Sequence, residues 1–93
     1  MKCIYVYHNK FVGYYADPFV ADVEKDKMPE MVRRMIWLDL ENAKKNHMDE
    51  TELVYLGTFD DEKGVILLAE EKEVICDCSS IFAQRLKFEK GEA

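Results

Sequence analysis

The chain has 93 residues, of which 48% are apolar and 12% aromatic, and its formal net charge is −6. This length allows one domain with a small core, and the composition is that of a globular chain, not a disordered one. Nineteen acidic residues against thirteen basic ones argue against a general phosphate-binding surface, because affinity for nucleic acid rests largely on Lys and Arg. A local basic patch, or an acidic surface that docks on a basic partner, stays compatible with this charge.

The first residues and the cysteines indicate the compartment. The opening MKCIYVYHNK is too short and too polar for a signal peptide, and no apolar run approaches the length that spans a membrane. The three cysteines are an odd number and come without a secretory signal. We therefore expect a cytoplasmic protein with reduced thiols and no membrane contact.

The N-terminal half predicts two extended segments and one long helix. Residues 2–8 alternate and are rich in Tyr, Ile and Val, which favours a strand, and a tight turn follows at residues 8–10. Residues 11–22 predict a second extended stretch that ends, bends or lies at an edge at Pro18, because proline cannot donate to a sheet ladder. Residues 28–46 have helical periodicity, with Pro29 in the first turn. The apolar side chains of this helix share one broad face: Met28, Met31, Val32, Met35, Ile36 and Ala43.

The C-terminal half predicts a β-hairpin and a short helix. Residues 51–59 are apolar on both faces, so we expect a central strand with cover on both sides. A turn at residues 60–64 leads to a fourth strand at residues 65–71, and residues 71–78 continue that strand or add a fifth. Residues 79–88 predict a short helix, and the tail at residues 89–93 is expected to fray.

Residues 1–93 therefore predict a single α+β domain. It contains an antiparallel sheet of four to five strands, one main helix packed across the sheet, and a short C-terminal helix. The order of the elements, with hairpins and no crossover between strands, favours this arrangement.

The residue types that commonly carry catalysis or bind metals form no recognisable site. The three acids at residues 60–62 lack the alternate spacing of a calcium loop and are typical of the polar tip of a turn. Cys76 and Cys78 would share one face of a strand, where Cys3 could join them, but zinc sites use longer spacers and need a fourth ligand. Neither a nucleophile motif nor a phosphate-binding glycine loop is present. We therefore expect no enzyme activity, no cofactor and no metal site.

Aromatic side chains are concentrated on the predicted strands, and they allow two interpretations. If several share a solvent-facing surface of the sheet, they form a platform on which the bases of single-stranded DNA stack. Otherwise they pack beneath the helix or across a dimer interface, which we favour. The residues in question are Tyr5, Tyr7, Tyr14, Tyr15, Tyr55 and Phe59.

The polar face of the predicted helix carries basic residues around the tryptophan of the chain. Trp37 is either a contact residue for a partner or a contact of the C-terminal segment. Candidate residues for binding a partner or nucleic acid are Arg33, Arg34, Trp37, Lys44 and Lys45 from the helix and Tyr5, Tyr7, Tyr14 and Tyr55 from the strands.

Four segments, in order, resemble a known family: the strand MKCIYVY, the segment YYADPF, the amphipathic helix, and the hairpin YLGTFDDEKG. Over roughly residues 1–68 the chain is similar to the small non-structural protein that gokushovirus-type microviruses encode in their fifth open reading frame. The helical region is longer and more charged than in that family, and the segment EEKEVICDCSSIFAQRLKF has no counterpart there. The resemblance implies a protein absent from the virion. It also implies a link, by genome position, with the switch from duplex replication to single-stranded progeny DNA. It carries over no catalytic residues to this chain.

Two hypotheses follow. The first is a non-enzymatic phage accessory protein of the bacterial cytoplasm that acts in single-stranded DNA synthesis or packaging. It would form a homodimer and bind a phage or host replication protein, with or without direct contact to single-stranded DNA, through the face around Arg33 and Trp37. The alternative is an acidic protein that blocks a host nuclease or defence factor by presenting carboxylates to a basic groove.

Overall fold

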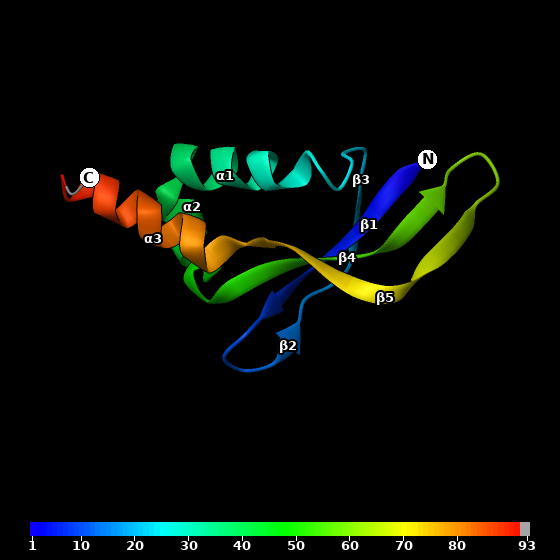
Figure 1. Cartoon of the computed structure of the whole chain (residues 1–93), viewed down its shortest axis with the longest axis horizontal. Helices are drawn as coiled ribbons and strands as arrows, with labels where there is room; N and C mark the ends of the chain where they lie inside the picture. Colours follow the sequence, from blue (N-terminus) through cyan, green and yellow to red (C-terminus); the bar gives the residue numbers. More distant parts are fainter. Residues whose placement is uncertain (92–93) are drawn as a thin grey trace.

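The computed structural model describes residues 1–91, which form a five-stranded antiparallel sheet with helices packed against it (Figure 1). This confirms the predicted α+β class. In chain order the elements are β1 (Lys2–Asn9), β2 (Tyr14–Tyr15), β3 (Phe19–Ala21), α1 (Met28–Leu38), α2 (Leu40–Lys45), the 3-10 helix η1 (Met48–Glu50), β4 (Thr51–Asp60), β5 (Val65–Asp77) and α3 (Cys78–Glu89).

The sheet is built around β1 and β4, which pair along their length. β5 lies on the other side of β4, and the short strands β2 and β3 share the outer side of β1. The predicted central position of the strand at residues 51–59 is therefore confirmed. Pro18 lies in the break between β2 and β3, where it interrupts pairing at the sheet edge as expected. Residues 71–77 continue β5 and do not form a further strand.

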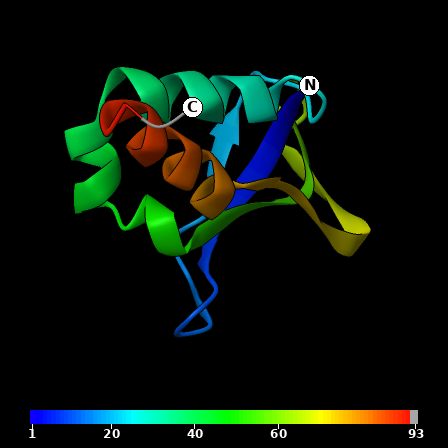
Figure 2. The ribbon, with the colours of Figure 1, turned by 60° about the vertical axis from the view of Figure 1, so that its left-hand side comes forward.

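The hydrophobic core lies between the sheet and the helices. α1 places Met28, Val32 and Ile36 on the sheet because residues four apart share one helix face. They pack against Tyr5 and Leu53, both fully buried. α3 runs beside α1 in both ribbon views and extends the same core (Figures 1 and 2).

The other face of the sheet is sheltered by the sheet itself, not by helices. Ile4, Val6 and Val54 alternate with the core residues on their strands and are also buried. Lys72 of β5 donates a hydrogen bond to the Tyr15 hydroxyl of β2 at 3.1 Å, which joins the two edges of the sheet. The sheet therefore curls over this face. The strand at residues 51–59 was expected to be covered on both sides, and on this side the edges of the sheet provide the cover.

The single helix predicted over residues 28–46 is wrong in one respect, because it is divided at Asp39. The backbone of Asp39 is non-helical, with φ −139° and ψ 76°, and its side chain accepts a hydrogen bond from the Asn42 amide at 3.1 Å. Aspartate competes for backbone amides in this way and so favours a new helix start. The chain therefore changes direction between α1 and α2. As a result, α2 lies at one end of the cavity that borders α1.

The β4–β5 hairpin extends away from the helices along the long axis of the molecule (Figure 1). Its tip is the predicted turn: Asp60 Oδ1 accepts from the amides of Glu62 at 3.0 Å and Lys63 at 3.2 Å, and Gly64 has φ 68°. The predicted C-terminal helix is confirmed and reaches Glu89. Residues 92–93 of the tail that was expected to fray lie outside the described residues. Within residues 1–91, no helix has the length and apolar character needed to cross a membrane.

Candidate partner-binding groove

A groove runs between α1 and the edge of the sheet formed by β3 and β2. It consists of two cavities of about 490 and 450 Å³, and Tyr7 and Met35 belong to the walls of both. The cavities are therefore neighbouring parts of one depression, which we call the α1 groove. One part is lined almost entirely by apolar groups. The other, which we call the polar part, has polar side chains among a mostly apolar lining.

The apolar part lies between α1 and β3. Its walls include Phe19 and Ala21 of β3, and Met31, Met35 and Leu38 of α1. The three α1 residues are 48%, 37% and 85% exposed, so a row of large apolar side chains faces solvent. Methionine fills irregular contacts well because its side chain is unbranched and polarizable. A flexible apolar surface of this kind is typical of sites that bind proteins.

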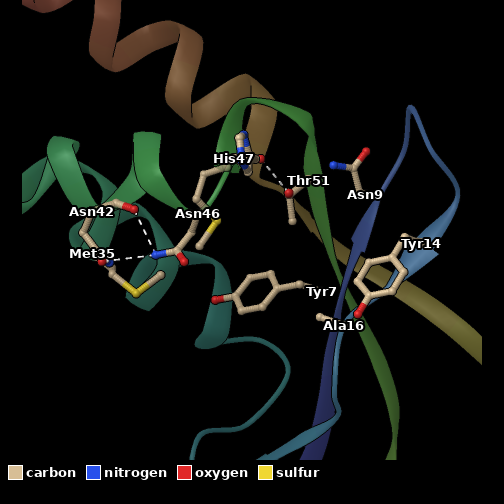
Figure 3. Close-up of a pocket in the computed structure, with 10 residues that line it drawn as sticks. Tyr7, Asn9, Tyr14, Ala16, Met35, Asn42, Asn46, His47 and Thr51 are labelled. Carbon is tan, nitrogen blue, oxygen red and sulfur yellow. Dashed lines mark hydrogen bonds between the residues drawn. The ribbon is translucent and has the colours of Figure 1, made fainter.

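The polar part lies where α2 and η1 approach β1 and β2. Figure 3 shows Tyr7 extending into the space between Asn46 and Ala16. Asn46 Nδ2 donates to the Asn42 carbonyl at 2.9 Å, and Thr51 Oγ1 donates to the His47 carbonyl at 2.8 Å. The first bond ties the Asn46 side chain to α2, and the second ties the start of β4 to the turn after α2, so together they fix this wall of the groove.

Tyr7 is the residue that joins the two parts. Burial, and secondarily the nearby thiols of Cys78 and Cys76, raise the pKa of Tyr7 to about 12. Its hydroxyl therefore stays protonated over the physiological range. It offers a neutral donor where the two parts of the groove meet.

The predicted tyrosine platform is not an exposed surface. Tyr5 is fully buried, and its hydroxyl donates a hydrogen bond to the Val23 carbonyl. The prediction that Tyr5 contacts a partner or nucleic acid is therefore wrong. Tyr55 lies on the same helix-covered face, with its ring 6.1 Å from that of Tyr5 and the Lys25 ammonium 4.6 Å from the ring centre. The interpretation that the tyrosines pack beneath the helix therefore holds for Tyr5 and Tyr55. Of the four candidates, Tyr7 and Tyr14 line the α1 groove.

Trp37 packs against α3, which is the second of the two interpretations given above. Its ring lies 5.1 Å from that of Phe88, with the guanidinium groups of Arg33 and Arg85 at 5.1 and 5.6 Å from its centre. Arg85 also donates to the Trp37 carbonyl at 3.2 Å, and Arg33 donates to Gln84 at 3.0 Å. Trp37 and Arg33 thus build the junction of α1 and α3.

The predicted basic residues do not form a single contact face. Arg33 contacts α3, whereas Arg34 lines the α1 groove on the other side of the helix. Lys44 Nζ lies 3.5 Å from Glu41 Oε1 on the surface of α2, and Lys45 is the last residue of that helix. Arg34 is therefore the predicted cation that belongs to the groove.

Sequence reasoning put Met31 and Met35 on the same broad apolar helix face as Met28, Val32 and Ile36, and so missed the groove. A signal was present, because the apolar face of the predicted helix was broader than one sheet contact requires. The sheet is covered by one side of α1, which carries Met28, Val32 and Ile36. The neighbouring side of this helix, with Met31 and Met35, stays partly exposed to solvent.

The cysteines do not gather at one place. The sheet register puts Cys3 opposite Thr58 and Cys76 opposite Leu53, at different ends of β4. The buried thiols of Cys76 and Cys78 contact each other, and this hydrogen bond together with burial raises the pKa of Cys78. Across residues 1–91, no three His, Cys, Asp or Glu side chains are grouped so that they could hold a metal ion.

Comparison with known proteins finds no matching family model, no similar curated protein and no similar solved structure. The likeness to microviral proteins stays a prediction from the sequence motifs.

Proposed function

We propose that this chain is a non-enzymatic phage accessory protein of the bacterial cytoplasm, of the kind that microviruses use in single-stranded DNA synthesis or packaging. It acts by binding a phage or host replication protein. The observation that supports a protein partner is the α1 groove, in which Met31, Met35 and Leu38 face solvent beside Tyr7. Apolar side chains of a partner fit this surface.

The groove suits a protein better than nucleic acid. Sites for single-stranded DNA combine several cations with exposed aromatic rings. The apolar part of the α1 groove contains a single cationic side chain, Arg34, among its lining residues, and Tyr5 is buried away from it. Any direct DNA contact would rest on Tyr14, which is 63% exposed, and on the cations of α1 and α2.

Affinity capture tests the protein partner. The immobilised chain is exposed to lysate of infected host cells, and captured proteins are identified by mass spectrometry. We expect a replication protein to be retained, and to be lost with Met31→Lys plus Leu38→Lys, which place charges on the apolar wall. Val12→Lys is the matched control, because Val12 is 73% exposed but lies in the loop between β1 and β2. Equal capture by both variants would contradict a role for the groove.

A salt titration with labelled single-stranded DNA tests direct contact. Binding through phosphates weakens as salt rises, and Arg34→Ala would weaken it further. If the chain shows no binding at low salt, it acts through its protein partner alone.

A second candidate function, inhibition of a basic host nuclease or defence factor, is favoured by the charge of the β4–β5 hairpin. Residues 51–77 carry eight acidic and two basic side chains, so this segment has the net charge of the whole chain, −6. A projecting acidic hairpin is suited to a basic groove. Nuclease inhibition that disappears when Asp60, Asp61 and Glu62 become Asn, Asn and Gln would support this function over the first.

A further inference from the structure

The outer edge of β5 is a second exposed apolar surface, at the opposite edge of the sheet from the groove. Val65, Ile66, Leu67 and Leu68 are 43%, 60%, 55% and 74% exposed. β5 pairs with β4 on one side, and within residues 1–91 no strand pairs with its other side. An apolar strand with an open backbone edge readily pairs with another strand.

The alternation of side chains decides what can cover this edge. Leu67 lies opposite Thr58 and Ile66 lies opposite Phe59, so successive residues of β5 point to opposite faces of the hairpin. A helix would cover one face and leave the other exposed. A strand beside β5 covers apolar residues on both faces and also pairs the open backbone groups.

We infer that the strand is β5 of a second copy of this chain, paired antiparallel about a two-fold axis at Leu67. A two-fold axis perpendicular to the sheet keeps each side chain on its own face. One residue must therefore lie at the axis and face the same residue of the other copy. With the axis at Leu67, this residue meets its own counterpart, Ile66 meets Leu68, and Val65 meets Ala69. Every apolar residue then has an apolar neighbour.

The charges beside the apolar run select this register among its neighbours. Lys63 lies in the turn and Glu71 in the irregular segment 69–72 of β5, so neither belongs to the regular ladder. The axis at Leu67 brings Lys63 of one copy and Glu71 of the other to the same end of the paired segment. An axis at Ile66 would set Glu62 against Glu70, and an axis at Leu68 would set Ile66 against Glu70. Like charges or a charge against an apolar residue destabilise such pairs, so complementarity favours Leu67.

The pairing is limited to the apolar run. In this register residues 65–69 of one β5 pair with residues 65–69 of the other, and residues 70–77 of each β5 keep an unpaired outer edge. On the far side of the sheet the edges are β2 and β3, of two and three residues. Edges this short do not readily accept further strands. The α1 groove lies at that far edge, so the dimer carries two open grooves and its formation does not depend on the partner proposed for them.

The mass of the purified chain in solution, measured by light scattering at tens of micromolar, tests the pairing. We expect twice the mass of one chain. Leu67→Lys, which sets two cations against each other on the axis, should give the mass of one chain with an unchanged circular dichroism spectrum. Phe11→Lys should stay dimeric, because Phe11 is 77% exposed but lies between β1 and β2.

A charge exchange tests the register. Lys63→Glu should weaken the dimer, and Lys63→Glu combined with Glu71→Lys should restore it, because the pair is re-formed with reversed signs. A monomeric wild-type chain, or a dimer that survives Leu67→Lys, overturns the inference. Loss of the dimer in Met31→Lys plus Leu38→Lys, but not in Leu67→Lys, overturns it as well, since the interface would then be the groove.

Discussion

Gly57 is the residue on which the geometry of the β4–β5 hairpin depends most directly. Its φ is 157°, and a Cβ placed there would lie 2.2 Å from the Leu67 carbonyl oxygen. The two strands approach so closely because four residues of β5, 69–72, span the place where β4 has only Leu56. A side chain at residue 57 would therefore force the backbones of β4 and β5 apart.

We predict that Gly57→Ala destabilises the fold by about 2–4 kcal/mol. Gly64→Ala is the matched control, because Gly64 also has positive φ, 68°, but has no atom within 4 Å of an added Cβ among the described residues. It should cost about 1 kcal/mol. Urea unfolding of the three proteins measures both effects. An equal cost for the two substitutions would show that the close approach of β4 and β5 is not required.

Asp77 is the second residue with a specific energetic role, because it begins α3. Its carboxylate accepts from the Ser79 amide at 3.2 Å, from the Ser79 and Ser80 hydroxyls, and from Lys10 Nζ at 2.9 Å. These bonds, led by those from Ser79, lower the pKa of Asp77 to about 2. The carboxylate therefore stabilises the fold above the ordinary pKa of 3.8, and this contribution is lost as the pH falls toward 2.

Asp77→Ala should reduce the free energy of unfolding by about 1 kcal/mol at pH 7, the usual effect of removing a helix N-cap. The difference in the free energy of unfolding between wild type and variant should shrink steadily below pH 4. The reason is that protonation of Asp77 removes the same interactions from the wild type. Urea titrations at several pH values measure this difference. A difference that stays constant down to pH 3 would mean that the carboxylate charge has no part in the cap.

At the scale of elements, the sequence predicted those features that local chemistry determines. Alternating apolar residues gave the strands, and Asp60 with Gly64 gave the turn of the hairpin. Asp39 divided the helix through a side-chain bond that periodicity does not reveal. The α1 groove was also missed, because which flank of an apolar helix face stays open depends on how far the sheet extends beneath it. Close approach at Gly57 depends likewise on the register of two strands, which local patterns leave open.

The attachment of α3 to α1 depends on aromatic and cationic contacts at its end. Phe88 is 63% exposed, yet its ring packs on Trp37. Phe88→Ala should therefore destabilise the protein by about 1 kcal/mol, since an aromatic pair adds to the area that it buries. Phe11 is similarly exposed, and its ring pairs with no other aromatic ring of residues 1–91, so Phe11→Ala should change stability by less than about 0.5 kcal/mol. Thermal unfolding distinguishes them, and equal melting temperatures would argue against the Trp37 contact.

At the scale of the whole molecule, charge is divided along the long axis. The hairpin segment, residues 51–77, has a net charge of −6, whereas residues 28–50 and 78–91 together carry seven basic and six acidic side chains. The hairpin tip and the helical end lie at opposite ends of a molecule 49 Å long. Dimerisation through β5 would bring two acidic hairpins together, so their mutual repulsion opposes it at low salt.

This repulsion would make the affinity of the proposed dimer depend on salt. Screening at higher salt weakens repulsion between the hairpins, so the dimer should become tighter between about 20 and 200 mM salt. Binding to single-stranded DNA would change in the opposite direction. Sedimentation equilibrium across this range measures the dimer, and a dimer that weakens with salt would indicate that opposite charges hold the two copies together.

The packing of Trp37 also has a spectroscopic consequence. The chain has a single tryptophan, and it lies at the junction of α1 and α3 with its indole nitrogen buried and without a hydrogen-bond partner among the described residues. The fluorescence emission of Trp37 therefore shows, without any added label, whether α3 is packed against α1. A shift of the emission to longer wavelength when a partner binds would show that α3 is displaced, while an unchanged spectrum would show that the partner leaves this junction intact.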